Sequence, residues 1–376
     1  MGEEKLKHSP LDALHRELDA KMVPFAGWDM PLNYGPGILK EHLHTRAACS
    51  VFDVSHMGPM MVQPRSDDLQ VAAEALETLM PVDVAGLAEG RQRYGVLTTE
   101  DGGIIDDLMF ARLEQQFYLV VNAGNAEDVI YGIAEKLNET CLAGPLKNRA
   151  MLAVQGPRAA EAMSWVAPEA EGMRFMDVRE ITVGPTKALV SRSGYTGEDG
   201  FEISIDADHG EPLARALTGL DFVDMAGLGA RDSLRLEAGL CLYGNDIDRE
   251  TSPVEAGLTW AIQKVRRRGG EREGGFPGAE RILKELADGP SRRLVGLKPE
   301  GRAPVRAGAT LHVGDGPEIG HVTSGVFGPT VEGPVAMGYV AAGHAAEGTA
   351  LTAEVRGKRL PLTVQKLPFI TPGYKR

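Results

Sequence analysis

Hydrophobic positions in the first 80 residues recur mainly with helical spacing. Leu11, Leu14 and Leu18 fall on one face after Ser9-Pro10, which predicts an opening helix with Ser9 as its N-cap. The same spacing predicts helices over 38–48 and 68–80. Between the first two helices, residues 22–34 are rich in turn formers and aromatic residues. We expect this stretch to be a linking segment.

The period of the pattern shortens after residue 90. Runs typical of strands lie at 93–99, 104–112, 117–122, 150–155, 188–192 and 200–205, and helical spacing returns at 126–137, 211–220 and 230–240. This irregular mixture indicates an α+β fold rather than a regular βαβ series. The charged, glycine-rich residues 266–275 predict a loop or linker.

The last quarter of the chain is almost entirely of β type. Six apolar runs, separated by Gly and Pro turns, lie at 294–297, 309–313, 318–323, 334–341, 350–355 and 360–365. Their even spacing predicts a small barrel or sandwich. We therefore expect a domain over residues 1–275 and a second over 290–372, with the boundary near 275–290.

Length and composition support this division and exclude several functions. A chain of 376 residues exceeds the roughly 250–300 that one core usually serves. The net charge of −13 argues against nucleic-acid binding and against a polybasic membrane anchor. The three cysteines, Cys49, Cys141 and Cys241, are too scattered for a disulfide framework. The first residues lack the apolar stretch of a signal peptide, and no apolar run could span a membrane, so we expect a cytoplasmic protein.

Familiar nucleotide and metal motifs are missing from the sequence. There is no P-loop, no His-Glu-x-x-His and no Gly-x-Ser-x-Gly, and the glycines at 227 and 229 lack the third glycine of a dinucleotide fingerprint. His42 and His44 are two residues apart on an expected helix, so their side chains diverge and do not share a metal. We therefore expect an organic ligand and no metal.

An acidic pair stands inside an apolar strand. Asp106 and Asp107 interrupt the run 104–110, and neighbours in a strand face opposite sides, so one of the two should face inward. A buried carboxylate is costly unless it meets donors or serves a function. The alternative is that the pair merely tops the strand where it leaves a Gly-Gly turn. His56 is another candidate acid or base, although a hydrogen-bonded structural histidine is the interpretation we favour.

Two further segments combine polar side chains with glycines. Residues 191–202 place Tyr195 and Glu202 between glycines, which permit the backbone to approach a ligand closely. The alternative is a polar hairpin loop. Arg231 and Asp232 follow a glycine-rich stretch at an expected helix start, where Asp232 would cap the helix and Arg231 would grip a carboxylate or a planar ring. The alternative for Arg231 is a surface ion pair.

Taken together, these segments resemble the aminomethyltransferase family, the T-proteins of the glycine cleavage system. The matching stretches include Phe25-Ala-Gly-Trp28, Phe52-Asp-Val-Ser-His-Met-Gly58, Gly102-Gly-Ile-Ile-Asp-Asp-Leu108, Ser191-Arg-x-Gly-Tyr-Thr-Gly-Glu-Asp-Gly-Phe-Glu202 and Gly227-Leu-Gly-Ala-Arg-Asp-x-Leu-Arg-Leu-Glu-Ala-Gly239. They cover nearly the whole chain in the right order, which makes the resemblance specific.

The resemblance implies a three-domain cloverleaf, in which two interleaved α+β domains and a C-terminal β-barrel surround a channel for tetrahydrofolate. The implied reaction takes the aminomethyl group carried on the lipoyl arm of H-protein. It gives 5,10-methylenetetrahydrofolate, ammonia and dihydrolipoyl H-protein. We expect lipoylated H-protein as the partner, tetrahydrofolate as the acceptor and a monomeric enzyme.

The resemblance also assigns roles to individual residues. Asp107 matches the family's catalytic carboxylate, and Glu202 matches the acidic residue that binds the amino-pyrimidine edge of the pterin. The other positions expected to contact folate are Arg231, Tyr195, Tyr94, Met57 and Asn122, with Tyr374, Lys375 and Arg376 near its glutamate tail.

Two departures from the family pattern affect these expectations. Relatives often carry Tyr where Ala111 stands, so one folate contact is either missing or supplied elsewhere. The loop 266–275 is longer and more basic than usual, and it either meets the acidic H-protein or remains a solvated loop.

Two other functions remain open on this fold. One is a folate-dependent demethylase acting on dimethylsulfoniopropionate or a methylated glycine, which would diverge around the Asp pair. The other is a non-catalytic folate-binding protein of iron–sulfur cluster maturation, whose Lys-Gly-Cys-Tyr-x-Gly-Gln type segment does not occur here.

Overall fold

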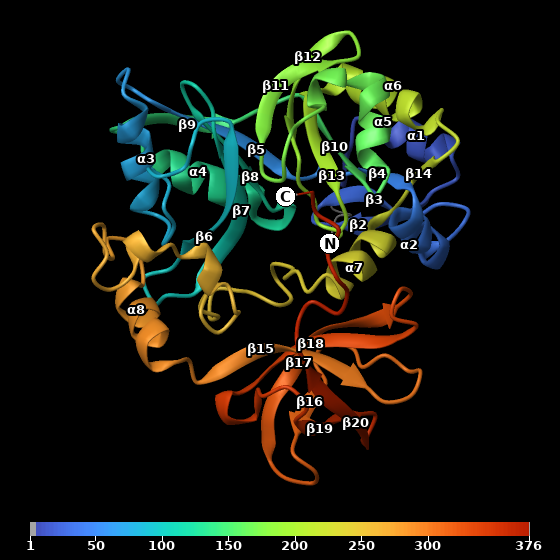
Figure 1. Cartoon of the computed structure of the whole chain (residues 1–376), viewed down its shortest axis with the longest axis vertical. Coiled ribbons are helices and arrows are strands. Elements are labelled where there is room, and N and C mark those ends of the chain that lie inside the picture. Colours follow the sequence, from blue (N-terminus) through green and yellow to red (C-terminus); the bar gives the residue numbers. More distant parts are fainter. Residues whose placement is uncertain (1–4, 376) are drawn as a thin grey trace.

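The chain folds into three lobes, and one helix packs between two of them. The computed structural model describes residues 5–375. Helix α7 (Leu228–Glu237) packs against elements of the N-terminal half and also against the C-terminal barrel, so it lies where the lobes join (Figure 1). Among residues 5–375, no helix has the length and apolar character needed to cross a lipid bilayer.

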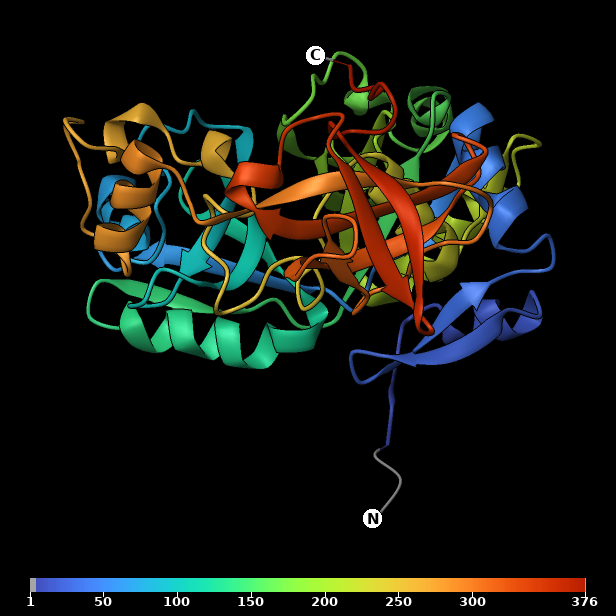
Figure 2. The same ribbon diagram turned by 90° about the horizontal axis from the view of Figure 1, so that it is seen from below.

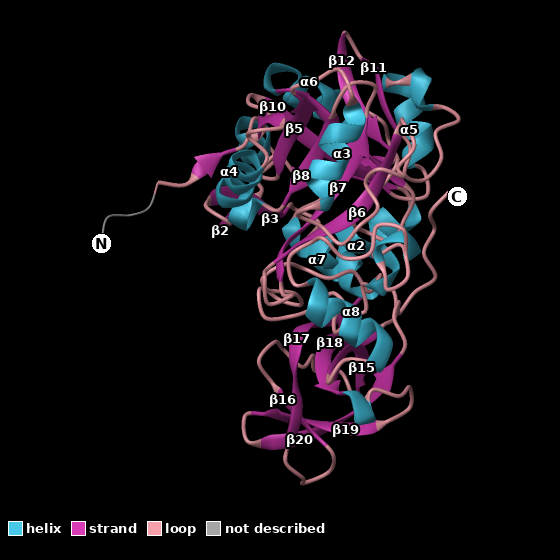
Figure 3. Ribbon diagram, turned by 90° about the vertical axis from the view of Figure 1, so that its left-hand side faces the viewer, coloured by secondary structure: helices cyan, strands magenta, loops and turns pink. Residues whose placement is uncertain are grey.

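The N-terminal segment forms a small sheet. Strands β1 (Lys7–His8), β2 (Lys21–Phe25) and β3 (Trp28–Asn33) pair in the order β1-β3-β2, so the prediction of a linking segment over 22–34 was wrong. Gly27 lies in the tight turn of the β2–β3 hairpin, whereas Pro24 and Pro31 lie within the strands. Figure 2 and Figure 3 show this sheet on the side of the molecule opposite to the C-terminal segment.

The predicted opening helix exists but is shorter than expected. Helix α1 (Asp12–Glu17) begins after Leu11 and has no side-chain cap. Ser9 does not cap it: its Oγ accepts a hydrogen bond from the Leu11 backbone N–H at 3.1 Å and donates one to Asp53 Oδ2 at 2.5 Å. Ser9 therefore ties the segment to a neighbouring strand instead of starting the helix.

The first lobe is a six-stranded sheet with helices packed on it. Its order is β11-β12-β13-β10-β4-β14. The strands are β4 (Cys49–Asp53), β10 (Arg149–Gln155), β11 (Val178–Val183), β12 (Thr186–Ser191), β13 (Gly200–Asp206) and β14 (Val223–Met225). The helices are α2 (Ile38–Ala47), α5 (Ala159–Val166) and α6 (Ala207–Thr218), with a short 3₁₀ turn at Pro168–Ala170. The predicted pairing of the strands near 188–192 and 200–205 is confirmed.

The second lobe is a five-stranded sheet in the order β6-β7-β8-β5-β9. Its elements are β5 (Gly58–Pro64), β6 (Arg91–Thr98), β7 (Ile104–Arg112), β8 (Phe117–Val121), β9 (Cys141–Pro145), α3 (Leu69–Glu77), α4 (Ala126–Lys136) and a 3₁₀ turn at Ala123–Asn125. Because β4 lies in the first sheet and β5 in the second, the chain crosses between lobes there and returns at β10. The two α+β lobes are therefore interleaved, as expected.

A closed barrel forms the third lobe. Its order is β15-β18-β17-β16-β19-β20. The strands are β15 (Arg292–Pro299), β16 (Thr310–His312), β17 (Glu318–Gly328), β18 (Gly333–Ala341), β19 (Ala350–Val355) and β20 (Lys358–Gln365), with a 3₁₀ turn at Ala342–His344. Each of the six predicted apolar runs became one of these strands. Figure 3 shows that this lobe is built mainly of strands.

Ion pairs attach the segment before the barrel to the second lobe. It contains 3₁₀ turns at Thr259–Ala261 and Lys264–Arg266, the loop 266–275 and helix α8 (Ala279–Asp288). Arg266 is buried and donates to Glu77 Oε2 at 3.0 Å, and Arg272 donates to the same oxygen at 3.0 Å and also bonds Asp83. The loop prediction is confirmed, but these arginines anchor it to the second lobe instead of leaving a solvated basic surface.

Candidate active site

The acidic pair lies on strand β7, with its two side chains on opposite faces. Asp106 is fully buried, and Asp107 faces Tyr94 of the adjacent strand β6, whose hydroxyl donates to Asp107 Oδ2 at 3.0 Å. The amide of Asn122, directly after β8, donates to Asp107 Oδ1 at 2.6 Å and to Asp106 Oδ1 at 2.8 Å. The pair is therefore hydrogen-bonded inside the sheet rather than topping the strand.

Burial weakens the acidity of both carboxyl groups. It raises the pKa of Asp107 to about 6, an effect that the bonds from Tyr94 and Asn122 partly oppose. It also raises the pKa of Asp106 to about 7, together with the negative charge of Asp107. Burial and the Asp107 charge raise the pKa of the Tyr94 hydroxyl, which remains a proton donor. Asp107 is thus a carboxylate whose proton affinity suits proton exchange near neutral pH.

An exposed aromatic residue, Trp260, lies beside Tyr94. The Trp260 ring lies 5.2 Å from the Tyr94 ring, centroid to centroid, while 59% of Trp260 remains exposed. We did not single out Trp260 from the sequence. Nothing in the local sequence marks it, because its contact with Tyr94 joins residues far apart in the chain.

Hydrogen bonds and close packing on Gln155 fix the glycine-rich loop between β12 and β13. Arg192 forms two hydrogen bonds to the Asp199 carboxylate, at 3.0 and 2.6 Å. A Cβ atom at Gly194 would lie 1.8 Å from Gln155 Oε1, so no larger residue fits there without displacing Gln155. This packing fixes Glu202, at the start of β13, where it accepts a hydrogen bond from Ser193 Oγ at 2.8 Å.

Glu202 lines a small cavity between the two sheets. The cavity is about 20 Å³ in volume, and Gln92, Met109, Tyr118 and Ser204 also line it. Ala111, where relatives often carry Tyr, is buried and pairs across the strands with Tyr118. The aromatic side chain at this place in the sheet therefore comes from β8 rather than β7.

Arg231 and Tyr195 form a second part of the site. The Arg231 guanidinium carbon lies 4.7 Å from the centre of the Tyr195 ring, and the Tyr195 hydroxyl donates to the Cys241 carbonyl. Arg231 Nη1 is buried and has no hydrogen-bond partner among residues 5–375. The surface ion pair considered for Arg231 was therefore wrong, and its guanidinium retains a free donor.

Asp232 does not cap helix α7, contrary to expectation. The helix begins at Leu228, so Asp232 lies within it and forms an ion pair with Arg235 at 2.8 Å. Gly227 takes the cap position because its backbone passes Leu32 so closely that a Cβ atom would lie 2.4 Å from the Leu32 carbonyl oxygen.

His56 and Met57 lie in the turn between β4 and β5. Met57 is half-buried and packs on the cluster that contains Ala226 and Ala230 at the start of α7. His56 is buried, and its Nδ1 has no hydrogen-bond partner in the described part of the chain. Burial lowers its pKa to about 4. The expectation of a hydrogen-bonded structural histidine is therefore not met at this nitrogen.

The C-terminal residues return to the glycine-rich loop. Tyr374 stacks on Phe175 with ring centroids 4.5 Å apart, and the Lys375 carbonyl accepts from the Phe175 backbone N–H at 2.9 Å. The Gly373 N–H donates to the Gly197 carbonyl at 2.8 Å. Arg376, predicted with them, lies outside the described residues.

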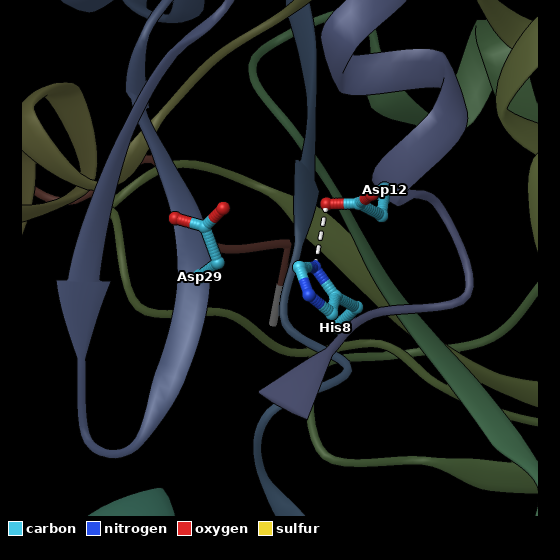
Figure 4. Close-up of side chains that lie close together, drawn as sticks. All are labelled: His8, Asp12 and Asp29. Carbon is cyan, nitrogen blue, oxygen red and sulfur yellow. Dashed lines mark hydrogen bonds and ion pairs between the residues drawn. The ribbon is translucent and has the colours of Figure 1, made fainter. Parts of the chain in front are cut away.

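One group of side chains has the composition of a metal site. His8, Asp12 and Asp29 have ligand atoms within 4.8 Å of one another, and Figure 4 shows His8 hydrogen-bonded to Asp12, with Asp29 on the adjacent strand. The Arg16 guanidinium already donates to both Asp12 oxygens, at 3.0 and 2.9 Å, and to Asp29 at 2.7 Å. Because a cation already neutralises these carboxylates, we assign no metal to them.

Comparisons with known proteins place this site in context. The model of the GCVT N-terminal domain matches residues 11–266, and that of the glycine cleavage T-protein C-terminal barrel domain matches residues 292–370. The mitochondrial aminomethyltransferase of Gallus gallus is 44% identical over 379 residues, which cover 99% of this chain and 94% of that protein. That of Dictyostelium discoideum is 40% identical over 390 residues, with the same coverage.

A solved structure is also similar throughout. The crystal structure of glycine cleavage system aminomethyltransferase T from Bartonella henselae has a TM-score of 0.91 and 45% sequence identity. The match covers 99% of this chain and 100% of that one. It agrees with the α+β lobes and the C-terminal barrel described above.

Proposed function

Because the chain belongs to the glycine cleavage T-protein family, the aminomethyltransferases of the glycine cleavage system, we propose that it forms 5,10-methylenetetrahydrofolate at Asp107. The donor in this proposal is the aminomethyl group on the lipoyl arm of H-protein, and the other products are ammonia and dihydrolipoyl H-protein. The relatives reported above carry the name aminomethyltransferase, so a demethylase or a non-catalytic protein is not favoured.

The observation that carries the proposal is the environment of Asp107. Tyr94 and Asn122 donate to its two different oxygens, which leaves the carboxylate oriented by fixed partners. Burial brings its pKa to about 6, so it is ionised at neutral pH yet still able to take a proton. A carboxylate with these properties suits the transfer of a proton from an attacking nitrogen.

The proton balance of the reaction defines what Asp107 must do. Two folate nitrogens each form a bond to the transferred carbon and each lose one proton. One of these protons completes ammonia as the carbon–nitrogen bond of the donor breaks, and the other completes the thiol as the carbon–sulfur bond breaks. A single carboxylate that accepts and returns protons serves both transfers.

The remaining predicted residues suit a folate molecule. Arg231 keeps a buried donor without a partner, and a buried donor is costly unless a ligand satisfies it. Glu202 offers acceptors to the paired donors of an amino-pyrimidine edge. The 20 Å³ cavity beside Glu202 holds little more than a water molecule, so a ring bound there requires some of the lining side chains to move. The set that we propose for folate contact is completed by Tyr195, Met57, Tyr374, Tyr94 and Asn122.

The test is a comparison of two aspartates of the same hairpin. Asp107→Asn should keep the fold and tetrahydrofolate binding but lose most turnover, by about 10²–10⁴-fold if it removes the general base. Asp101→Asn, at an exposed position in the turn before β7, should keep full turnover. Turnover of Asp107→Asn close to that of Asp101→Asn would show that the assigned role is wrong.

Location, oligomeric state and domain limits remain predictions. A cytoplasmic monomer is expected from the sequence, whereas the relatives from Gallus gallus and Dictyostelium discoideum are named mitochondrial. We retain domains over 1–275 and 290–372. In limited proteolysis, the first cleavage should fall within 275–290. A first cleavage anywhere else would contradict this division.

A further inference from the structure

Asp106 is the buried neighbour of Asp107 and has no role in the reaction proposed above. It is fully buried on strand β7, whereas its neighbour faces the opposite side of the sheet. Among the described residues, neither carboxylate forms an ion pair with a lysine or arginine, and burial is the largest influence on both. Burying an ionisable group without a cation is costly, and such groups are often retained for function.

Asp106 is satisfied by backbone and amide donors that also hold Asp107. Its Oδ1 accepts from the Asp107 backbone N–H at 3.1 Å and from Asn122 Nδ2 at 2.8 Å. Its Oδ2 accepts from the Asn122 backbone N–H at 3.1 Å. Two of these three bonds fix Asn122 from both its backbone and its side chain.

Asn122 in turn fixes Asp107. The same Nδ2 that meets Asp106 donates to Asp107 Oδ1 at 2.6 Å and to the Asp107 carbonyl at 2.9 Å. An amide rotated by 180° would direct its carbonyl oxygen at two carboxylate oxygens. Asp106 therefore adds to the preference, shared with two Asp107 oxygens, for the amide orientation in which Asn122 donates to Asp107.

We propose that Asp106 is a positioning residue that, through Asn122, sets the orientation and the protonation of Asp107. This inference rests on the role proposed for Asp107. The pair behaves as two coupled acids, in which the charge on one member favours the protonated form of the other. Coupling of this kind is reciprocal, which makes it measurable from either side.

The other polar groups near the pair come from three further parts of the chain. They are Tyr94 on β6, Tyr195 in the glycine-rich loop, and Cys241, Tyr243 and Asp246 in the segment after α7. Asp246 is held by Arg235 at 2.7 Å, and burial raises the pKa of both Tyr94 and Tyr195. Asp106 and Asp107 are therefore the groups of this set expected to titrate together between pH 5 and 8.

The first test follows the pH dependence of turnover. In Asp106→Asn, the acid limb of kcat/KM should move to higher pH, because Asn122 is no longer held and its hydrogen bond lowers the pKa of Asp107. Loss of orientation should lower kcat by about 10–100-fold, with a smaller change in the KM for tetrahydrofolate. Asp177→Asn, a change at another buried aspartate paired with Arg91, is the matched control and should leave the acid limb unmoved.

The second test needs neither turnover nor a folded Asp106 variant. Infrared difference spectra of the wild-type protein should show carboxyl groups that titrate well above the usual range of aspartate. In Asp107→Asn, the remaining Asp106 signal should titrate at lower pH than in the wild type, because the coupling is reciprocal. Failure of the proposed reaction would leave this result intact, so the two hypotheses fail separately.

The inference is overturned by either of two results. An acid limb in Asp106→Asn at the same pH as in Asp177→Asn would reduce Asp106 to a structural residue. Infrared titrations of Asp106 that are identical in the wild type and in Asp107→Asn would show that the two carboxyl groups are not coupled.

Discussion

The side chain of Arg235 joins helix α7 to the barrel, and its loss should destabilise the protein strongly. Only 2% of Arg235 is exposed. It donates to Asp246 Oδ2 at 2.7 Å, to the Leu240 carbonyl at 3.1 Å and to Ser324 Oγ in β17 at 2.8 Å. Asp246 is 1% exposed and also accepts from Thr323 Oγ1 at 2.5 Å. Arg235→Ala would leave this carboxylate buried without its cation.

The expected cost follows from the burial of both partners. Removing one member of a buried ion pair costs about 3–5 kcal/mol, because the other charge stays desolvated. This loss corresponds to about 10²–10³·⁵ in the folding equilibrium. Urea unfolding, followed by circular dichroism and by tryptophan fluorescence, measures it as a lower midpoint.

Two further variants make the experiment selective. Arg215→Ala removes a guanidinium that also bonds two carboxylates, Glu17 and Glu211, but is 43% exposed. Its midpoint should not change, since exposed pairs contribute little. The double variant Arg235→Met/Asp246→Leu removes both buried charges and should recover part of the loss. A midpoint for Arg235→Ala equal to that of Arg215→Ala would refute the reasoning.

Three other outcomes follow from the site. The kcat/KM should rise with pH through about 6 and then level off, because Asp107 must lose its proton to act as a base; a profile flat from pH 5 to 8 would contradict this. Glu202→Gln should raise the dissociation constant of tetrahydrofolate about tenfold, measured by calorimetry, and an unchanged value would count against the pterin contact. Gly194→Ala should lower the unfolding midpoint and weaken folate binding, because its Cβ would lie 1.8 Å from Gln155 Oε1; wild-type values for both would show that the loop adapts.

Much of the fold could be predicted because local patterns and final structure agree. The helices α2, α3 and α4 and all six barrel strands lie where periodicity placed them. The failures arose where tertiary contacts override local signals. Strands β2 and β3 contain Pro24 and Pro31, which suggested a linker, yet they form part of a small outer sheet that tolerates proline. The short strand β14 is defined only by its pairing with β4.

The sequence indicated which residues form the candidate site better than it indicated the hydrogen bonds and contacts between them. Strand alternation indicated that one carboxylate of the Asp pair is buried, but not that Asn122 joins both. Asp232 lost its expected capping role because Gly227 starts the helix earlier, which depends on contact with a distant strand. Trp260 escaped notice because its importance lies in its distance from Tyr94, a residue far away in sequence.

The central claim is tested most directly by offering two donors to the wild-type protein with tetrahydrofolate. One sample receives aminomethyl-loaded H-protein and the other dimethylsulfoniopropionate, and methylene- and methyl-tetrahydrofolate are followed separately, with ammonia. The account predicts methylenetetrahydrofolate and an equal amount of ammonia from the first sample and no product from the second. Methyltetrahydrofolate from the second sample alone would contradict it.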